Sequence, residues 1–164
     1  MQAMTDQNAP SSEGTAASGQ ILLFNMGDVL ACVDLGKVER TVSLVAMRVI
    51  PGSAGYVAGI MDYAGCSMPV IDLAIRLGLP SSPYTLNTPI IVYRHQQQRI
   101  ALIVEDIIGI RIPGEQDRQL ATQFARYGTA VRASVHTDQG VALLLDVSWL
   151  MQPELFECVT ENDG

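Results

Sequence analysis

Short apolar segments separated by turn residues recur along the whole chain. Ten of them have the length and the content of β-branched and aliphatic side chains that are typical of strands. They cover residues 21–26, 29–35, 42–50, 56–63, 67–71, 90–95, 99–105, 106–113, 130–137 and 140–146. Turn signals about every ten residues, without long helical patterns between them, predict a mainly β fold of small barrels or a sandwich.

Four hairpins are predicted from the residues between these segments. The turns are Gly27-Asp28, Ala64-Gly65-Cys66, His95 to Gln98, and Asp138 to Gly140. Proline cannot donate a hydrogen bond to a neighbouring strand, so Pro69 predicts that the segment 67–71 is an edge strand or the start of a strand. Residues 114–126 are polar and predict a loop with a partial helix.

Two segments of the chain resemble each other. Each of PVIDLAIRL and LLLDVSWLM runs from a strand through an aspartate into a short helical turn. Asp72 and Asp146 are predicted N-caps, and Gly78 is predicted to end the first helix. The repeat indicates two similar halves. The predicted core comprises Ile71, Leu73, Leu77, Leu102, Val104, Leu143 and Leu145.

Length and composition favour one domain with its own core. The chain has 164 residues, 48% of them hydrophobic, and its apolar runs are too short to cross a bilayer. We expect residues 1–20, which are neither a signal peptide nor rich in apolar side chains, to be disordered. We expect the folded domain to span 21–151 and residues 152–164 to form an acidic tail. The formal net charge of −7 argues against a nucleic-acid or anionic-membrane surface.

Candidate catalytic and metal-binding groups are sparse. Cys32, Cys66 and Cys158 fit neither a disulfide framework nor a zinc site, and His95 and His136 have no partner at ligand spacing. No phosphate-binding glycine loop occurs, so we expect no metal, no nucleotide and no other cofactor. Cys66 with a histidine brought near by folding leaves a thiol enzyme as one alternative. Asp72 and Asp146 leave an acid–base pair as another, although helix capping accounts for both. Six arginines scattered along the chain are expected to be solvated, namely Arg94, Arg99, Arg111, Arg118, Arg126 and Arg132.

The segment from Gly59 to Leu73 resembles the signature of the CheW family, which typically reads G-V-x-N-L-R-G-x-x-x-P-V-I-D-L. Gly59, Gly65, Pro69 and Asp72 match its spacing without a gap. FNMGDVLACVDLGKVER, IIVYRHQQQRIALIVEDIIGI and GVALLLDVSWLM resemble further parts of the family. The resemblance covers about 130 residues, from Ile21 to Met151.

This resemblance implies a fold of two small five-stranded, SH3-like β-barrels on a shared core, with short helices. It also implies a function, which is that of a non-enzymatic cytoplasmic adaptor. Such an adaptor joins the cytoplasmic tips of chemoreceptors to the regulatory domain of a CheA-type histidine kinase, in arrays beneath the membrane. No nucleic acid and no direct membrane insertion are implied.

Three departures from the family pattern fall on its contact segments. Asp62-Tyr63-Ala64 replaces the usual Asn-Leu-Arg, so a recurrent arginine is missing at Ala64. Val38-Glu39-Arg40-Thr41 stands where V-x-E-[IV] is usual, which places a positive charge at Arg40 instead of an acid. Ala54 replaces a usual proline. Loss of an arginine removes a charge and five donors, so the partner should differ.

The departures favour a specialised pathway, such as type IV pilus function or surface sensing, over standard flagellar chemotaxis. They also leave open a module that competes with the true coupling protein. The expected partner-binding residues are Val38, Arg40, Asp62, Tyr63, Ala64 and Gly65. Tyr63 is the expected anchor because tyrosine is enriched at interface hot spots, and the alternative is that its ring folds back over its own barrel.

Overall fold

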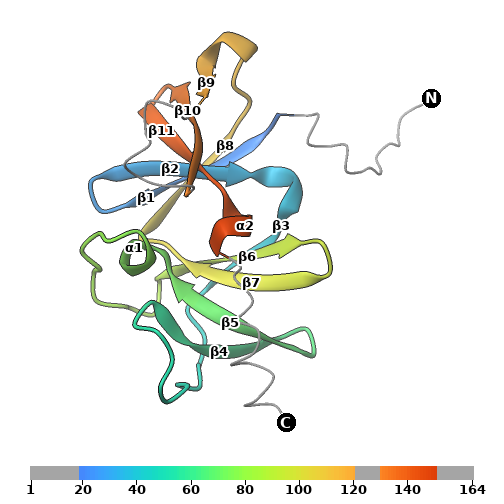
Figure 1. The fold of residues 1–164 in the computed structure, drawn as a ribbon, viewed down its shortest axis with the longest axis vertical. Helices are drawn as coiled ribbons and strands as arrows, with labels where there is room; N and C mark the ends of the chain where they lie inside the picture. The colour runs from blue at the N-terminus through green and yellow to red at the C-terminus, as the bar shows by residue number, and fades with distance from the viewer. Residues whose placement is uncertain (1–18, 121–129, 151–164) are drawn as a thin grey trace, which may run out of the picture.

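The computed structural model describes residues 19–120 and 130–150, and Figure 1 shows the path of the chain. Eleven strands and two short α-helices form these parts, so the predicted mainly β class is confirmed. The strands are β1 (Ile21–Met26), β2 (Val29–Asp34), β3 (Val38–Ser43), β4 (Val57–Tyr63), β5 (Cys66–Asp72), β6 (Pro89–His95), β7 (Gln98–Ile103), β8 (Asp106–Arg111), β9 (Arg118–Leu120), β10 (Val131–Thr137) and β11 (Gly140–Leu145). The helices are α1 (Leu73–Arg76) and α2 (Val147–Leu150), with 3-10 turns η3 (Leu35–Lys37) and η4 (Glu115–Asp117).

The strands form two sheets, and each curls towards a barrel. One sheet has the order β8-β1-β2-β11-β10-β9, and the other has the order β3-β6-β7-β5-β4. The chain passes directly from β8 at one edge of the first sheet through η4 to β9 at the other edge. In the second sheet, the chain after β3 reaches β4, where Arg48 and Ile60 exchange backbone hydrogen bonds of 2.8 and 2.9 Å. We call these units the first barrel and the second barrel.

The two barrels are built from an internal repeat with matching registers. The hairpin β1–β2 corresponds to β6–β7, and β4–β5 corresponds to β10–β11; one parallel pair joins the hairpins in each barrel. Corresponding irregularities lie at Val57/Gly59 and Val131/Ala133. Each repeat ends on an aspartate whose backbone N–H donates at 2.8 Å, from Asp72 to the carbonyl of Tyr56 and from Asp146 to that of Ala130. The two similar halves inferred from the sequence are therefore present.

Each barrel combines strands from both repeats: the first joins β1–β2 to β8–β11, and the second joins β6–β7 to β3–β5. The strand that follows β1–β2, which is β3, pairs with β6 in the second barrel, whereas β8 follows β6–β7 and pairs with β1 in the first. Each exchanged strand carries one bulged residue, Glu39 in β3 and Ile108 in β8. Because each barrel takes strands from both repeats, neither repeat can form a barrel alone.

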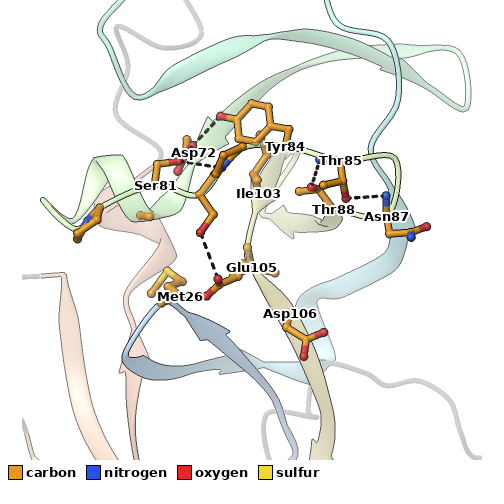
Figure 2. A pocket seen from close by; sticks show the side chains of 16 residues that line it. Met26, Asp72, Ser81, Tyr84, Thr85, Asn87, Thr88, Ile103, Glu105 and Asp106 are labelled. Carbon is orange, nitrogen blue, oxygen red and sulfur yellow. Dashed lines mark hydrogen bonds between the residues drawn. The ribbon is translucent and has the colours of Figure 1, made fainter.

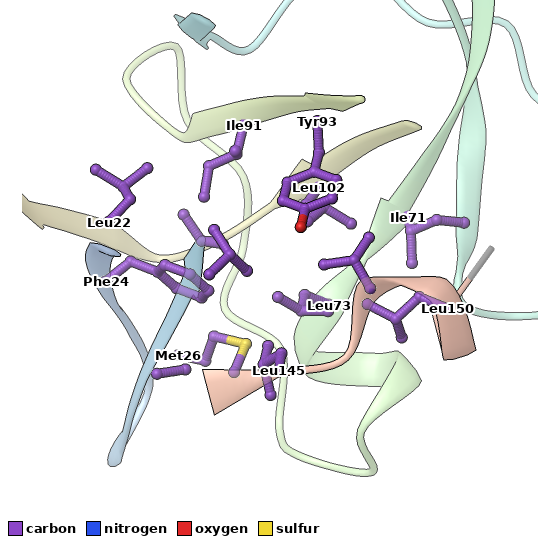
Figure 3. Close-up of a cluster of buried hydrophobic side chains, with 14 of the residues drawn as sticks. Leu22, Phe24, Met26, Ile71, Leu73, Ile91, Tyr93, Leu102, Leu145 and Leu150 are labelled. Carbon is purple, nitrogen blue, oxygen red and sulfur yellow. The ribbon is translucent and has the colours of Figure 1, made fainter. Parts of the chain in front are cut away.

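A shared apolar core joins the barrels, as Figure 3 shows. Phe24 and Met26 from the first barrel meet Tyr93 and Leu102 from the second, and Leu150 of α2 covers the same cluster. Separate clusters fill the barrel interiors. The first barrel contains Ile21, Leu23, Cys32, Ala133, Val135, Ala142 and Leu144, and the second contains Met61, Met68, Val70, Ile90, Val92, Ala101 and Ile103.

The four predicted hairpins are confirmed, and several local predictions are corrected. The strand expected at 42–50 is wrong, because β3 ends at Ser43 and the chain then leaves the sheet, with Arg48 as an isolated bridge. Pro69 is not on an edge strand, because β5 lies between β7 and β4. It is tolerated there because the parallel ladder with β7 begins only at Val70.

Most of the predicted core is confirmed. Ile71, Leu73, Leu102, Val104 and Leu145 are at most 2% exposed. Leu77 and Leu143 are only partly buried against the shared core, whereas the neighbouring Leu144 is 1% exposed and fills the first barrel. Leu143 packs on the shared core from the same face of β11 as Leu145, but it is only partly covered, and an unbroken apolar run does not show where that cover ends.

The predicted tails at 1–20 and 152–164 lie largely or wholly outside the described residues, as does the part of the 114–126 segment from 121 on. Within that segment the partial helix is η4, followed by β9. In the parts of the chain that the structure describes, no helix combines the length and apolarity needed to cross a membrane.

Candidate functional site

The six candidate partner-binding residues lie in two segments of the second barrel. Val38 and Arg40 belong to β3, and Asp62 and Tyr63 end β4. Ala64 and Gly65 form the two-residue turn to β5, with φ values of +53° and +80°. Both values fit the type I′ hairpin turn, whose twist matches that of the flanking strands. The strand order places β3 and β4 at opposite edges of the sheet.

Side chains connect these two segments across the sheet. Arg99 of β7 donates through Nε to the carboxylate of Glu39 at 3.1 Å and through Nη1 to Sγ of Cys66 at 3.0 Å. Arg94 of β6 donates to the same carboxylate at 3.3 Å. We call Glu39, Arg94, Arg99 and Cys66 the polar end of the second barrel. Glu39 lies between Val38 and Arg40, and Cys66 follows Gly65, so the polar end joins both candidate segments.

The polar end covers one end of the second barrel's interior. Side chains two residues apart in a strand share a face. Arg99 therefore shares the face of Ala101, and Cys66 shares that of Met68, both of which belong to the interior cluster. The side chains of Arg99 and Glu39 are only 27% and 24% exposed. The expectation that the arginines are simply solvated is therefore wrong for Arg99.

Tyr63 lies beside this surface with its ring partly buried. It packs against the interior cluster of the second barrel, and its side chain is only half-buried. Its position therefore fits the structural alternative, in which the ring folds back over its own barrel, and leaves part of the ring available for contact. Asp62 is exposed, accepts from the Ser67 hydroxyl at 2.7 Å and lies 3.9 Å from Arg48.

A separate pocket of about 330 Å³ lies between the barrels and the 80–88 linker, as Figure 2 shows. At its wall, the carboxylate of Asp72 is 2% exposed and accepts hydrogen bonds from Ser81 Oγ at 2.7 Å and Tyr84 Oη at 2.6 Å. It also accepts from the backbone N–H of Ile75 at 3.2 Å, which is the predicted N-cap. Burial, together with the hydrogen bond to Asp72, raises the pKa of Tyr84. Asp72 thus caps α1 and anchors the linker.

The arrangement does not support the acid–base pair. Asp146 is occupied as the cap of α2, where it accepts from the backbone N–H and the hydroxyl of Ser148. Asp72 already accepts three hydrogen bonds of its own. Both aspartates are therefore explained by the capping role that the sequence predicted.

The contacts of Cys32 and Cys66 do not support the thiol-enzyme alternative. Burial raises the pKa of the Cys32 thiol to about 12, so Cys32 stays protonated. Cys66 is exposed, but the group that contacts its sulfur is the guanidinium of Arg99. A guanidinium remains protonated and cannot take a proton from the thiol. No group of three or more potential metal ligands occurs among the described residues.

Glu39 and Arg99 were missed as site residues by sequence reasoning. The alternation Arg99, Ala101, Ile103 already places Arg99 on an inward face, and this was the available signal. The bulge that turns Glu39 towards Arg99 depends on pairing with β6, a strand about fifty residues further along the chain, and has no local signature.

Comparisons with known proteins agree on one family. The family model described as the CheW-like domain matches residues 20–154. The chemotaxis protein CheW of Rhizobium meliloti is 25% identical over 116 residues, covering 68% of this chain and 75% of the relative. CheW of Thermotoga maritima is 22% identical over 145 residues, covering 88% and 92%. Protein PilI of Pseudomonas aeruginosa is 24% identical over 102 residues, covering 62% and 57%.

The fold has a close counterpart among solved structures. The crystal structure of scaffolding protein TtCheW from Thermoanaerobacter tengcongensis superposes with a TM-score of 0.73 at 22% identity. The match covers 79% of this chain and 89% of that one. At this identity the likeness establishes the fold alone.

Proposed function

This chain belongs to the CheW-like domain family, and on that premise we propose that it is a non-enzymatic adaptor in a chemosensory pathway. It binds the cytoplasmic tip of a chemoreceptor and the regulatory domain of a CheA-type histidine kinase. It acts in the cytoplasm, where these partners recruit it to membrane-associated receptor arrays.

The observation that carries the proposal is the convergence of the two candidate segments on one surface. Arg40 follows Glu39, the Asp62–Gly65 turn precedes Cys66, and Arg99 contacts both Glu39 and Cys66, whereas the side chain of Val38 packs against the shared core. A surface built from β3, β4, β5 and β7 with the turn between β4 and β5 suits protein recognition. In the pocket beside the 80–88 linker, the buried carboxylate of Asp72 is already engaged by Ser81 and Tyr84.

We further infer a specialised pathway, such as type IV pilus function or surface sensing. Two observations support it. Arg40 and Ala64 replace an acid and an arginine on the contact surface, so a conventional partner meets altered charge. The chain also resembles PilI of Pseudomonas aeruginosa as well as chemotaxis proteins.

A direct test is whether the chain bridges both partners at once. The regulatory domain of a CheA-type kinase and the cytoplasmic fragment of a chemoreceptor from the same genome would be mixed with it and analysed by size-exclusion chromatography with light scattering. We expect one peak that contains all three proteins. Binding of neither partner would refute the adaptor function.

Ala64 also supports a second candidate, a module that competes with the true coupling protein without bridging. The same measurement separates the two functions. A competitor forms a binary complex with either the kinase domain or the receptor fragment but never the ternary complex, and it displaces a conventional coupling protein from that partner.

A further inference from the structure

The internal repeat supplies a comparison for the polar end. When the hairpins β6–β7 and β1–β2 are aligned by their internal registers, Arg99 corresponds to Leu30. The same alignment of β4–β5 with β10–β11 makes Cys66 correspond to Gly140. The bulged residues Glu39 and Ile108 are also equivalent. The first barrel therefore has Ile108, Leu30 and Gly140 where the second has Glu39, Arg99 and Cys66.

The contacts are equivalent as well as the positions. Leu30 and Ile108 pack against the interior cluster of the first barrel, and a β-carbon on Gly140 would lie 3.9 Å from Cδ2 of Leu30. One barrel thus closes this end with apolar contacts, and the other closes it with charged groups. Since apolar closure serves the same fold, stability does not require the charges in the second barrel.

The segments of the second barrel carry more positive than negative charge, although the chain as a whole is negatively charged. Residues 37–72 and 89–103 contain five of the ten lysines and arginines but only three of the seventeen acids, and one of the three is the buried Asp72. At the polar end, Glu39 is shared between Arg94 and Arg99, which leaves an excess of positive charge. Arg40 is exposed, and no ion pair engages it among the described residues.

We propose that the polar end of the second barrel determines which partner this adaptor accepts, and that the accepted receptor presents a carboxylate-bearing segment to Arg40 and Arg94. This inference rests on the proposed adaptor function. Arginine forks recognise carboxylates with defined geometry, and complementary charge raises the association rate and excludes partners of the wrong charge. The pairing with Glu39 holds Arg94 and Arg99 in place before the partner arrives.

The test uses the cytoplasmic fragment of a chemoreceptor from the same genome, titrated by calorimetry. Arg40→Gln removes one positive charge at the surface, and Gln139→Glu changes the net charge equally at the corresponding turn of the first barrel. We expect Arg40→Gln to weaken binding about ten-fold at low salt and Gln139→Glu to leave it unchanged. Wild-type affinity should fall between about 50 mM and about 500 mM NaCl, and less steeply for Arg40→Gln.

A second variant tests the polar end itself. Glu39→Ile with Arg99→Leu installs the residue types that close the first barrel, so the melting temperature should be kept while receptor binding falls at least about ten-fold. The inference would be overturned if Arg40→Gln and the folded double variant both bound the receptor fragment with wild-type affinity, or if the affinity of the wild-type protein did not depend on salt. The adaptor function would stand in either case. A wild-type chain that binds neither the receptor fragment nor the kinase domain would overturn both.

Discussion

The α-carbon of Gly59 lies against the backbone carbonyl of Arg48, so closely that an added β-carbon would come within 2.6 Å of that oxygen. The same residue has a φ of +156°. Arg48 is the point at which the chain after β3 reaches β4 and helps to close the second barrel. The first glycine of the family signature is therefore explained by barrel closure.

Replacing Gly59 with alanine should destabilise the protein by about 2–4 kcal/mol, because the β-carbon clashes with backbone and the φ value is strained for any other residue. Urea unfolding followed by circular dichroism measures the change. Gly36→Ala is the matched control, since nothing lies within 4 Å of its β-carbon position. Equal stabilities of the two variants would show that the Arg48 segment is not held against β4.

Two residues on the same face of β11, Leu143 and Leu145, make a second prediction. Leu145 is 2% exposed, so Leu145→Ala should cost about 2–5 kcal/mol in free energy of unfolding. Leu143→Ala should cost clearly less, about 1–2 kcal/mol, because its side chain is already partly exposed. Paired urea melts of the two variants measure this difference. The reverse order would mean that Leu143, and not Leu145, is the more deeply buried of the two side chains.

Sequence patterns were sufficient for the elements whose determinants are local. The hairpins followed from turn residues, and the helix starts at Asp72 and Asp146 followed from capping chemistry. The repeat was visible because each half ends with the same strand–aspartate–helix order. In contrast, the position of β3, the place of β5 inside the sheet and the Glu39–Arg99 contact all depend on pairing between distant segments. The sequence therefore predicted two separate segments of the candidate site, but it did not predict Arg99, the residue that connects them.

Asp72 should contribute more to the free energy of unfolding than its counterpart Asp146. Asp72→Ala removes the cap of α1 and leaves the hydroxyls of Ser81 and Tyr84 without their acceptor, so we expect a loss of about 2–4 kcal/mol. Asp146→Ala removes a cap that bonds only to Ser148 in the described structure, so about 1 kcal/mol is expected. Thermal and urea unfolding of both variants check the ranking. A loss for Asp72→Ala no larger than for Asp146→Ala would contradict the anchoring of the 80–88 linker.

Alkaline pH should destabilise the protein through Cys32. Burial raises the pKa of this thiol from 9.0 to about 12, so the unfolded chain loses the proton first as pH rises. The contribution to stability is complete below about pH 9 and is lost between about pH 9 and pH 12. From about pH 8 to about pH 10 the expected loss is about 1 kcal/mol. Unfolding free energies of Cys32→Ala should fall less over this interval; the same fall in both proteins would exclude Cys32 as the cause.

Ala64→Arg makes the last prediction, because it restores the residue that is usual in the family at the turn beside the polar end. Ala64 is exposed and already has a φ of +53°, and arginine tolerates that value no worse than alanine, so stability should stay within about 0.5 kcal/mol. The added charge lies close in sequence to Cys66, whose sulfur contacts Arg99.

Binding should respond according to partner. A conventional coupling-protein partner should bind Ala64→Arg more tightly than wild type, because a usual contact is restored. The native receptor and kinase should bind it equally or more weakly, since their surfaces fit alanine at this turn. Calorimetry with both sets of partners measures the affinities of the wild-type protein and of Ala64→Arg. Tighter binding of the native partners together with no gain for the conventional ones would show that the missing arginine does not set partner choice.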